Sequence, residues 1–298
     1  MTLKNINLKE KLVLLSLTAL LAAGCNNGTK KDSDDLPPVD STQSTILNVN
    51  GEIFSIPSPI QTAFLIKNTG ASYDKKILNP SNKSAGYSTN FSKGVNLGIY
   101  GADLGYVTIY DQNQDAIGYL NSAKKLADEL GVSGAFSPKT IERFQKNLGK
   151  QDSMLVLVGD AYRSSDSYLK NNDRNDVSGL VLAGGWIESL YFATNVYKTK
   201  ATDDVKRRIA EQKSSLQSLI KLLKQYYSQP EYTEFVDNLE DLSTVYDGIS
   251  FKYTYEKPTI DPANRMTIIN SKSEIKITPE QIETITQKIK TIRNQIIG

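Results

Sequence analysis

Apolar residues recur every three or four positions through most of the chain, which predicts a mainly helical protein. The clearest run is at the C-terminus, where one helix face carries Ile282, Ile285, Ile289, Ile292 and Ile296. Thr278 and Gln281 have the spacing of a capping box, so we expect this last helix to begin there. Similar patterns predict helices over residues 59–67, 94–110, 115–130, 138–148, 152–170, 176–197, 209–226 and 232–246.

One stretch near the C-terminus has a different period. Ile249, Phe251, Tyr253 and Tyr255 alternate with polar residues, and residues 273–277 alternate again. A period of two is typical of strands, so we expect a small β element near residues 249–277, between the last two helices. The predicted fold class is therefore mainly α, with antiparallel helical hairpins or a bundle and this minor β element.

A repeat architecture is an alternative for part of the chain. Large and small residues between Tyr100 and Ala123 resemble the pattern of a tetratricopeptide unit, which would make the fold TPR-like. The proline that closes such a unit is missing, and no second copy follows in register. Generic packing of helical hairpins explains the pattern better.

The first residues have the composition of a bacterial lipoprotein signal. Lysines precede an apolar run over residues 12–22, which at about 11 residues is shorter than the roughly 20 that a spanning helix needs. Residues 21–25 resemble a lipobox that ends in Cys25, the only cysteine of the chain. We therefore expect a signal peptide over residues 1–24 and a lipid anchor on Cys25. The alternative is a buried N-terminal helix with an incidental cysteine.

A polar segment follows the cysteine. Residues 25–45 are rich in Asn, Gly, Ser, Asp and Pro, so we expect a flexible tether ahead of a folded domain over residues 46–298. Asn26 replaces the aspartate that marks retention at the inner membrane in enterobacteria, which favours the outer membrane. The acidic cluster at residues 32–35 loosely resembles a surface-export signal, although a solvated linker explains it equally well.

Charge and missing residue types exclude several functions. Of 35 basic and 33 acidic residues, three lysines and one glutamate lie in residues 1–24, so the mature chain is formally neutral. Neutrality argues against a nucleic-acid partner. The chain contains no histidine, which removes the common nucleophilic triads and His-ligated zinc. Any enzyme here would have to use carboxylates, as paired-acid glycosidases do.

A metal site is also not expected. Asp111, Asn113 and Asp115 have the opening spacing of an EF-hand loop, but Ala116 and Ser122 stand where glycine and glutamate are required. The better interpretation is an interhelical loop in which Asp115 caps the following helix. We predict no cofactor and no metal.

Two glycine-containing helical segments carry the candidate ligand-binding residues. Gly98, Gly101 and Gly105 lie in one, and Gly184 and Gly185 in the other. Because glycine costs a helix about 1 kcal/mol, we expect close helix packing to offset it. The alternative is an aromatic and acidic pocket for a sugar or peptide, formed by Tyr100, Asp103, Trp186 and Glu188. If these acids are buried they need partners, for which the candidates are Arg143, Arg163 and Arg174.

Three runs carry a family resemblance: residues 180–191 (LVLAGGWIESLY), 96–104 (NLGIYGADL) and 56–59 (IPSP). They resemble uncharacterised lipoproteins of Bacteroidota, a group that implies no particular activity. We expect a membrane-anchored, non-enzymatic binding or scaffold domain of the cell envelope, whose partner is an envelope protein or a small ligand. The alternatives are a carboxylate-based hydrolase acting on envelope or dietary glycans and an accessory glycan-binding lipoprotein.

Overall fold

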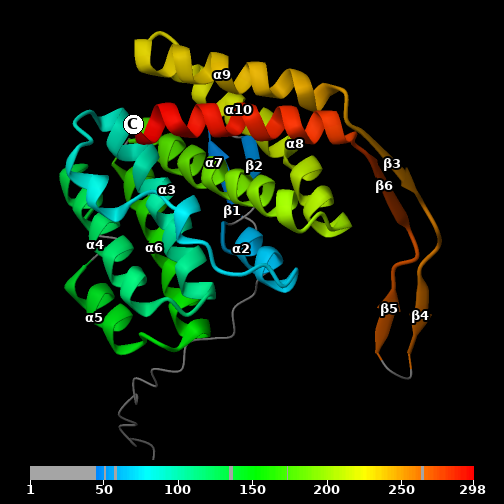
Figure 1. Ribbon diagram of the computed structural model, residues 1–298, viewed down its shortest axis with the longest axis horizontal. Coiled ribbons are helices and arrows are strands. Elements are labelled where there is room, and N and C mark those ends of the chain that lie inside the picture. The colour runs from blue at the N-terminus through cyan, green and yellow to red at the C-terminus, as the bar shows by residue number, and fades with distance from the viewer. Residues whose placement is uncertain (1–44, 50–51, 57–58, 134–136, 173, 263–264) are drawn as a thin grey trace, which may run out of the picture. The chain divides into compact units, whose positions relative to one another are not determined.

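The computed structural model describes residues 45–49, 52–56, 59–133, 137–172, 174–262 and 265–298 (Figure 1). Cys25, the expected signal peptide and the expected tether up to residue 44 lie outside the described residues. The described part is mainly helical and fits a helical bundle, as predicted. Its α-helices are α2 (Pro59–Asn68), α3 (Asn90–Ile109), α4 (Asn113–Glu129), α5 (Pro138–Lys146), α6 (Gln151–Asn171), α7 (Asn175–Thr199), α8 (Asp203–Leu223), α9 (Pro230–Asp247) and α10 (Pro279–Ile297).

Helices α3 and α7 form the centre of the bundle. Both are buried along most of their length, which follows from sequences that are apolar on nearly every face. Helix α7 contacts α2, α6, α8 and α10 as well as α3, and α4 covers α3 on another side (Figure 1). None of the described helices is both long enough and apolar enough to cross a membrane.

The two central helices cross at their glycines. A Cβ atom on Gly98 would lie 1.9 Å from the carbonyl oxygen of Val181, and one on Gly184 would lie 1.9 Å from that of Val95. Only a residue without a side chain allows backbones to approach this closely. The glycines therefore serve helix packing, the explanation that the sequence favoured.

Capping residues set several of the helix ends. The predicted capping box of Thr278 and Gln281 is present at the start of α10. Helix α3 begins four residues earlier than predicted, because Thr89 and Ser92 form a second capping box in a polar segment that apolar periodicity does not reveal. At α4 the expectation was wrong: the N-cap is Gln112, and Asp115 lies within the first turn.

The β element between α9 and α10 is an antiparallel ribbon. Strand β3 (Ser250–Thr254) pairs with β6 (Lys272–Lys276), which confirms the predicted pair. Beyond them β4 (Thr259–Asp261) pairs with β5 (Met266–Ile268), which the sequence did not predict. We call residues 250–276 the ribbon; it extends away from the helices (Figure 1). A further unpredicted pair, β1 (Thr45–Val49) with β2 (Glu52–Ile56), precedes α2.

Candidate functional site

All four candidate residues from the sequence lie inside the bundle. Tyr100 and Asp103 belong to α3, Trp186 and Glu188 belong to α7, and none of the four is more than 2% exposed. The Tyr100 hydroxyl donates to the carbonyl oxygen of Pro80 at 3.0 Å. The Trp186 indole instead donates to Gln212 of α8, also at 3.0 Å. The charge of Glu188 acts on Asp103, and that of Asp103 acts on the Tyr100 hydroxyl, so these three residues share one interior region. Trp186 packs toward α8 instead.

Glu188 forms a buried ion pair with Arg293 of α10. The guanidinium donates to both carboxylate oxygens, Nε to Oε2 at 2.5 Å and Nη2 to Oε1 at 2.6 Å. The same Nη2 donates to the Ile77 carbonyl at 2.9 Å, and the guanidinium carbon lies 4.2 Å from the centre of the Tyr191 ring. Arg293 thus joins α10 to α7 and to the segment before α3, at a site from which water is excluded.

The three arginines that we considered as partners lie elsewhere. Arg163 pairs with Asp160 on its own helix, and Arg174 lies 3.7 Å from Asp176. Arg143 lies on α5, and the ion-pair partner of Glu188 is instead Arg293. Arg293 is four residues after Ile289 and so borders the apolar stripe of α10, which is the one local signal that it faces inward.

Asp103 adds a second buried carboxyl group to this cluster. It is fully buried, and among the described residues neither of its side-chain oxygens has a hydrogen-bond partner. Its pKa is raised well above the usual value, chiefly by burial and then by the neighbouring charge of Glu188, with Arg293 acting in the opposite direction. One guanidinium therefore faces two buried carboxyl groups, and burial beside Glu188 favours the neutral form of Asp103.

This arrangement predicts a particular pH dependence of stability. A carboxyl group with a raised folded-state pKa binds its proton more tightly in the folded protein, so its contribution is complete below the unfolded pKa of about 3.9 and is lost as pH rises through the folded pKa. The Asp103→Asn variant keeps the shape of the side chain but has no group that titrates. We expect its melting temperature, relative to wild type, to increase as pH is raised. A melting-temperature difference between Asp103→Asn and wild type that does not change with pH would contradict the assignment.

Two asparagines extend the buried polar cluster, and no pattern in the sequence pointed to either. The Asn79 amide donates to the Tyr87 hydroxyl at 3.0 Å and to Asn96 Oδ1 at 3.2 Å. The Asn96 amide in turn donates to the Ile296 carbonyl at 3.2 Å. These bonds connect the segment before α3, α3 itself and the end of α10, so the cluster as a whole fastens the C-terminal helix to the core.

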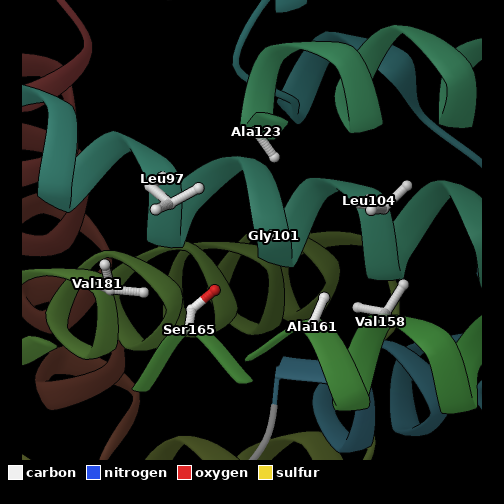
Figure 2. A pocket seen from close by; sticks show the side chains of 8 residues that line it. All are labelled: Leu97, Gly101, Leu104, Ala123, Val158, Ala161, Ser165 and Val181. Carbon is white, nitrogen blue, oxygen red and sulfur yellow. The ribbon is translucent and has the colours of Figure 1, made fainter. Parts of the chain in front are cut away.

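A small apolar cavity adjoins Gly101, between α3, α4, α6 and α7 (Figure 2). Ser165 contributes the one polar side chain among the labelled residues in that view. The cavity volume is about 20 Å³, which is room for a single water molecule. The bare backbone of this central helix is therefore not a site for a sugar or a peptide. The lining residues are Leu97, Gly101, Leu104, Ala123, Val158, Ala161, Ser165 and Val181.

The truncated EF-hand motif lies at a surface cleft. Asp115 accepts a hydrogen bond from Tyr73 at 2.7 Å and pairs with Lys75 at 2.5 Å, so its carboxylate is engaged by protein donors. Burial raises the pKa of Asp115, but the hydrogen bonds from Lys75 and Tyr73 and the charge of Lys75 together hold it below its usual value. The described residues contain no group of three His, Cys, Asp or Glu side chains that could hold a metal ion.

Large apolar side chains are exposed chiefly on the ribbon. Tyr253 is 66% exposed and Ile269 is 78% exposed, and every residue of the four strands is at least partly exposed. The other exposed large apolar residues of the ribbon are Phe251, Tyr255, Ile260, Met266 and Ile268. Scattered apolar residues are normal on protein surfaces, whereas a concentration of this kind is typical of interaction surfaces.

Comparison with known protein families, curated proteins and solved structures finds no match for this chain.

Proposed function

We propose that this chain is a non-enzymatic binding protein of the bacterial cell envelope, held on a membrane by lipid on Cys25. In this proposal the helical bundle is a rigid support and the ribbon is the binding element. The observation that carries the proposal is the contrast between the buried acidic residues of the bundle and the exposed apolar residues of the ribbon. Asp103 and Glu188 are 0% exposed, whereas Tyr253 is two-thirds exposed.

The ribbon has the properties of an element that is completed by a partner. An isolated two-stranded hairpin is marginally stable in water, and its open edges and apolar side chains attract other chains. On β3, Phe251 and Tyr253 lie on one face, while Lys252 and its cross-strand partner Glu274 lie on the other. One apolar face and one charged face are what a surface needs in order to bind a partner and remain soluble without it.

The buried acids support this proposal over hydrolysis by paired carboxylates. A glycosidase needs two carboxyl groups in an open cleft, with one of them available as nucleophile or base. Here both oxygens of Glu188 accept bonds from Arg293, and neither Glu188 nor Asp103 reaches solvent. The pair instead stabilises the position of α10.

One experiment in cells tests both parts of the proposal. Cells make the protein with a photo-crosslinking amino acid at position 253 and are fed a fatty acid that can be labelled. We expect the label on the wild-type chain but not on Cys25→Ser, because the chain has no other cysteine. Labelled Cys25→Ser would contradict the anchor.

The same cells test the ribbon. We expect a crosslinked product from position 253 and none from Tyr168, an exposed tyrosine on α6 that serves as the matched control. Replacing Phe251 and Tyr255 by serine should remove the product without lowering the melting temperature, because both side chains are already exposed. Equal crosslinking from positions 253 and 168 would show that the ribbon is not the binding element.

A further inference from the structure

We propose that the surface cleft beside Asp115 binds a sugar acid, a small sugar ring that carries one carboxylate. The cleft lies between the segment that precedes α3 and the first two turns of α4, and it shares no residue with the ribbon. Its volume is about 520 Å³, which falls within the roughly 300–1,000 Å³ of pockets that enclose small molecules. The proposal adds a second binding site to the protein and does not depend on what the ribbon binds.

The segment that forms one wall of the cleft is held in place through its backbone. It contains two short 3₁₀ helices, η1 (Lys75–Ile77) and η2 (Ser81–Ala85). Three buried side chains, each from a different helix, donate hydrogen bonds to its carbonyl oxygens: Arg293 to Ile77 at 2.9 Å, Tyr100 to Pro80 at 3.0 Å and Ser122 to Ser81 at 2.7 Å. A site that is rigid before its ligand arrives loses less entropy on binding. The cleft is therefore preformed.

The charges that line the cleft leave one lysine without a partner. Lys75 pairs with Asp115 at 2.5 Å, and the Tyr73 hydroxyl donates to the same carboxylate at 2.7 Å. The charge of Asp115 is thereby balanced within the protein. Lys76 also lines the cleft, and within the described part of the chain no ion pair involves it. A single unpaired lysine favours a ligand with a single negative charge.

Neutral polar side chains supply the contacts that sugar hydroxyls need. Asn82, Gln114 and Ser81 line the cleft, and their side chains form no hydrogen bond with other described residues. Amide and hydroxyl side chains both donate and accept hydrogen bonds, as the hydroxyl groups of a sugar do. These three side chains therefore match a ligand that carries several hydroxyl groups beside its carboxylate.

An apolar surface completes the cleft. The Tyr119 ring, Leu78 and Pro80 border it, next to Gly118 of α4. A Cβ atom on Gly118 would meet the Ser81 side chain, with Oγ at 3.3 Å, and no other described residue within 4 Å. This glycine therefore admits no second helix, unlike Gly98, and it leaves open space in the cleft instead. Pockets for small molecules commonly combine such apolar walls with a few polar groups that fix the orientation of the ligand.

A phosphate or a metal ion suits the cleft less well than a carboxylate. A phosphate monoester carries roughly two negative charges at neutral pH, whereas the lining offers one unpaired lysine. A metal ion would have to displace Lys75 and Tyr73 from Asp115, the acidic residue of the lining. The charge of the cleft therefore favours a carboxylate as the anionic group of the ligand.

Two pairs of sugars test the proposal on the full-length protein in detergent. Galacturonate and galactose differ only in the carboxylate that replaces a hydroxymethyl group, and glucuronate and glucose form the second pair. In ligand-observed NMR titrations we expect at least one acid to bind about tenfold more tightly than its neutral parent, because a hydrogen bond to a charged group adds to the affinity. Equal affinities within both pairs, or no binding of either acid, would overturn the proposal. Tighter binding of galactose 1-phosphate than of galacturonate would overturn the choice of a carboxylate.

Three variants assign the binding to the cleft. Lys76→Met should remove the preference for the acid and leave the weaker binding of the neutral sugar, whereas Asn82→Ala should weaken both sugars by the same factor. Lys139→Met on α5, an exposed lysine outside the cleft, is the matched control and should bind as wild type does. Lys76 is exposed, so its replacement should leave the melting temperature unchanged. An unchanged preference in Lys76→Met would show that the acid binds elsewhere and would overturn the assignment.

Discussion

Replacing Arg293 by methionine is expected to lower the free energy of unfolding by about 3–5 kcal/mol, the usual cost of leaving a buried charge without its partner. Methionine keeps much of the volume but removes both hydrogen bonds to Glu188 and the bond to the Ile77 carbonyl. Glu188 is fully buried, so water cannot replace the lost donors. Equilibrium unfolding in guanidinium chloride measures the loss.

Two comparisons separate this effect from a general sensitivity to arginine removal. Arg163→Met breaks an ion pair with Asp160 whose arginine side chain is 62% exposed, so it should cost less than about 1 kcal/mol. Removing both members, in Glu188→Met with Arg293→Met, should be less destabilising than Arg293→Met alone, because no buried charge remains. Equal losses for Arg163→Met and Arg293→Met would refute the role given to the buried pair.

The sequence predicted most of the helices because the spacing of apolar residues is a local property, whether they occupy one face, as in α10, or nearly every face, as in α3 and α7. Helix α10 shows this best, since its isoleucine stripe and its capping box define both the face and the start. Strands β3 and β6 were predicted from alternation. Strands β4 and β5 were missed because strands of three residues on a largely exposed hairpin have no buried face to produce a pattern.

The buried cluster was only half predictable. Asp103 and Glu188 attracted notice because a carboxylate on an apolar helix needs a partner when it is buried. The partner could not be read from the sequence, because Arg293 is 105 residues away from Glu188 and the pairing depends on how α10 packs on α7. Asn79 gave no signal for the same reason: its partners are fixed by tertiary packing.

Helix α10 connects this cluster to the ribbon. Strand β6 ends at Lys276, Ile277 is buried, and the capping box at Thr278 starts the helix directly afterwards. The base of the ribbon is therefore fixed to a helix that Arg293 holds against α7. A change that weakens the buried Glu188–Arg293 pair should therefore loosen the support of the ribbon as well as lower the stability of the protein. Crosslinking from position 253 in such a variant should be compared with wild type at an equal fraction of folded protein.

The second large effect is expected at the crossing of α3 and α7. In Gly98→Ala the new methyl group would lie 1.9 Å from the Val181 carbonyl oxygen and 2.8 Å from the Gly185 nitrogen. Both are backbone atoms of α7, so a change of rotamer cannot relieve the clash and the helices must separate. Overpacking usually costs about 1–3 kcal/mol, and we expect this variant at or above the upper end.

Gly105→Ala on the same helix is the matched control. Its added methyl group would meet Ile60 at 3.5 Å, an ordinary contact, and alanine favours a helix over glycine by about 1 kcal/mol. We therefore expect Gly105→Ala to be neutral or stabilising while Gly98→Ala is strongly destabilising, both measured by equilibrium unfolding. The two substitutions are chemically identical and only seven positions apart. Opposite signs of the change in unfolding free energy can therefore come only from the close approach of α7. Equal signs would show that the helices do not cross where the glycines place them.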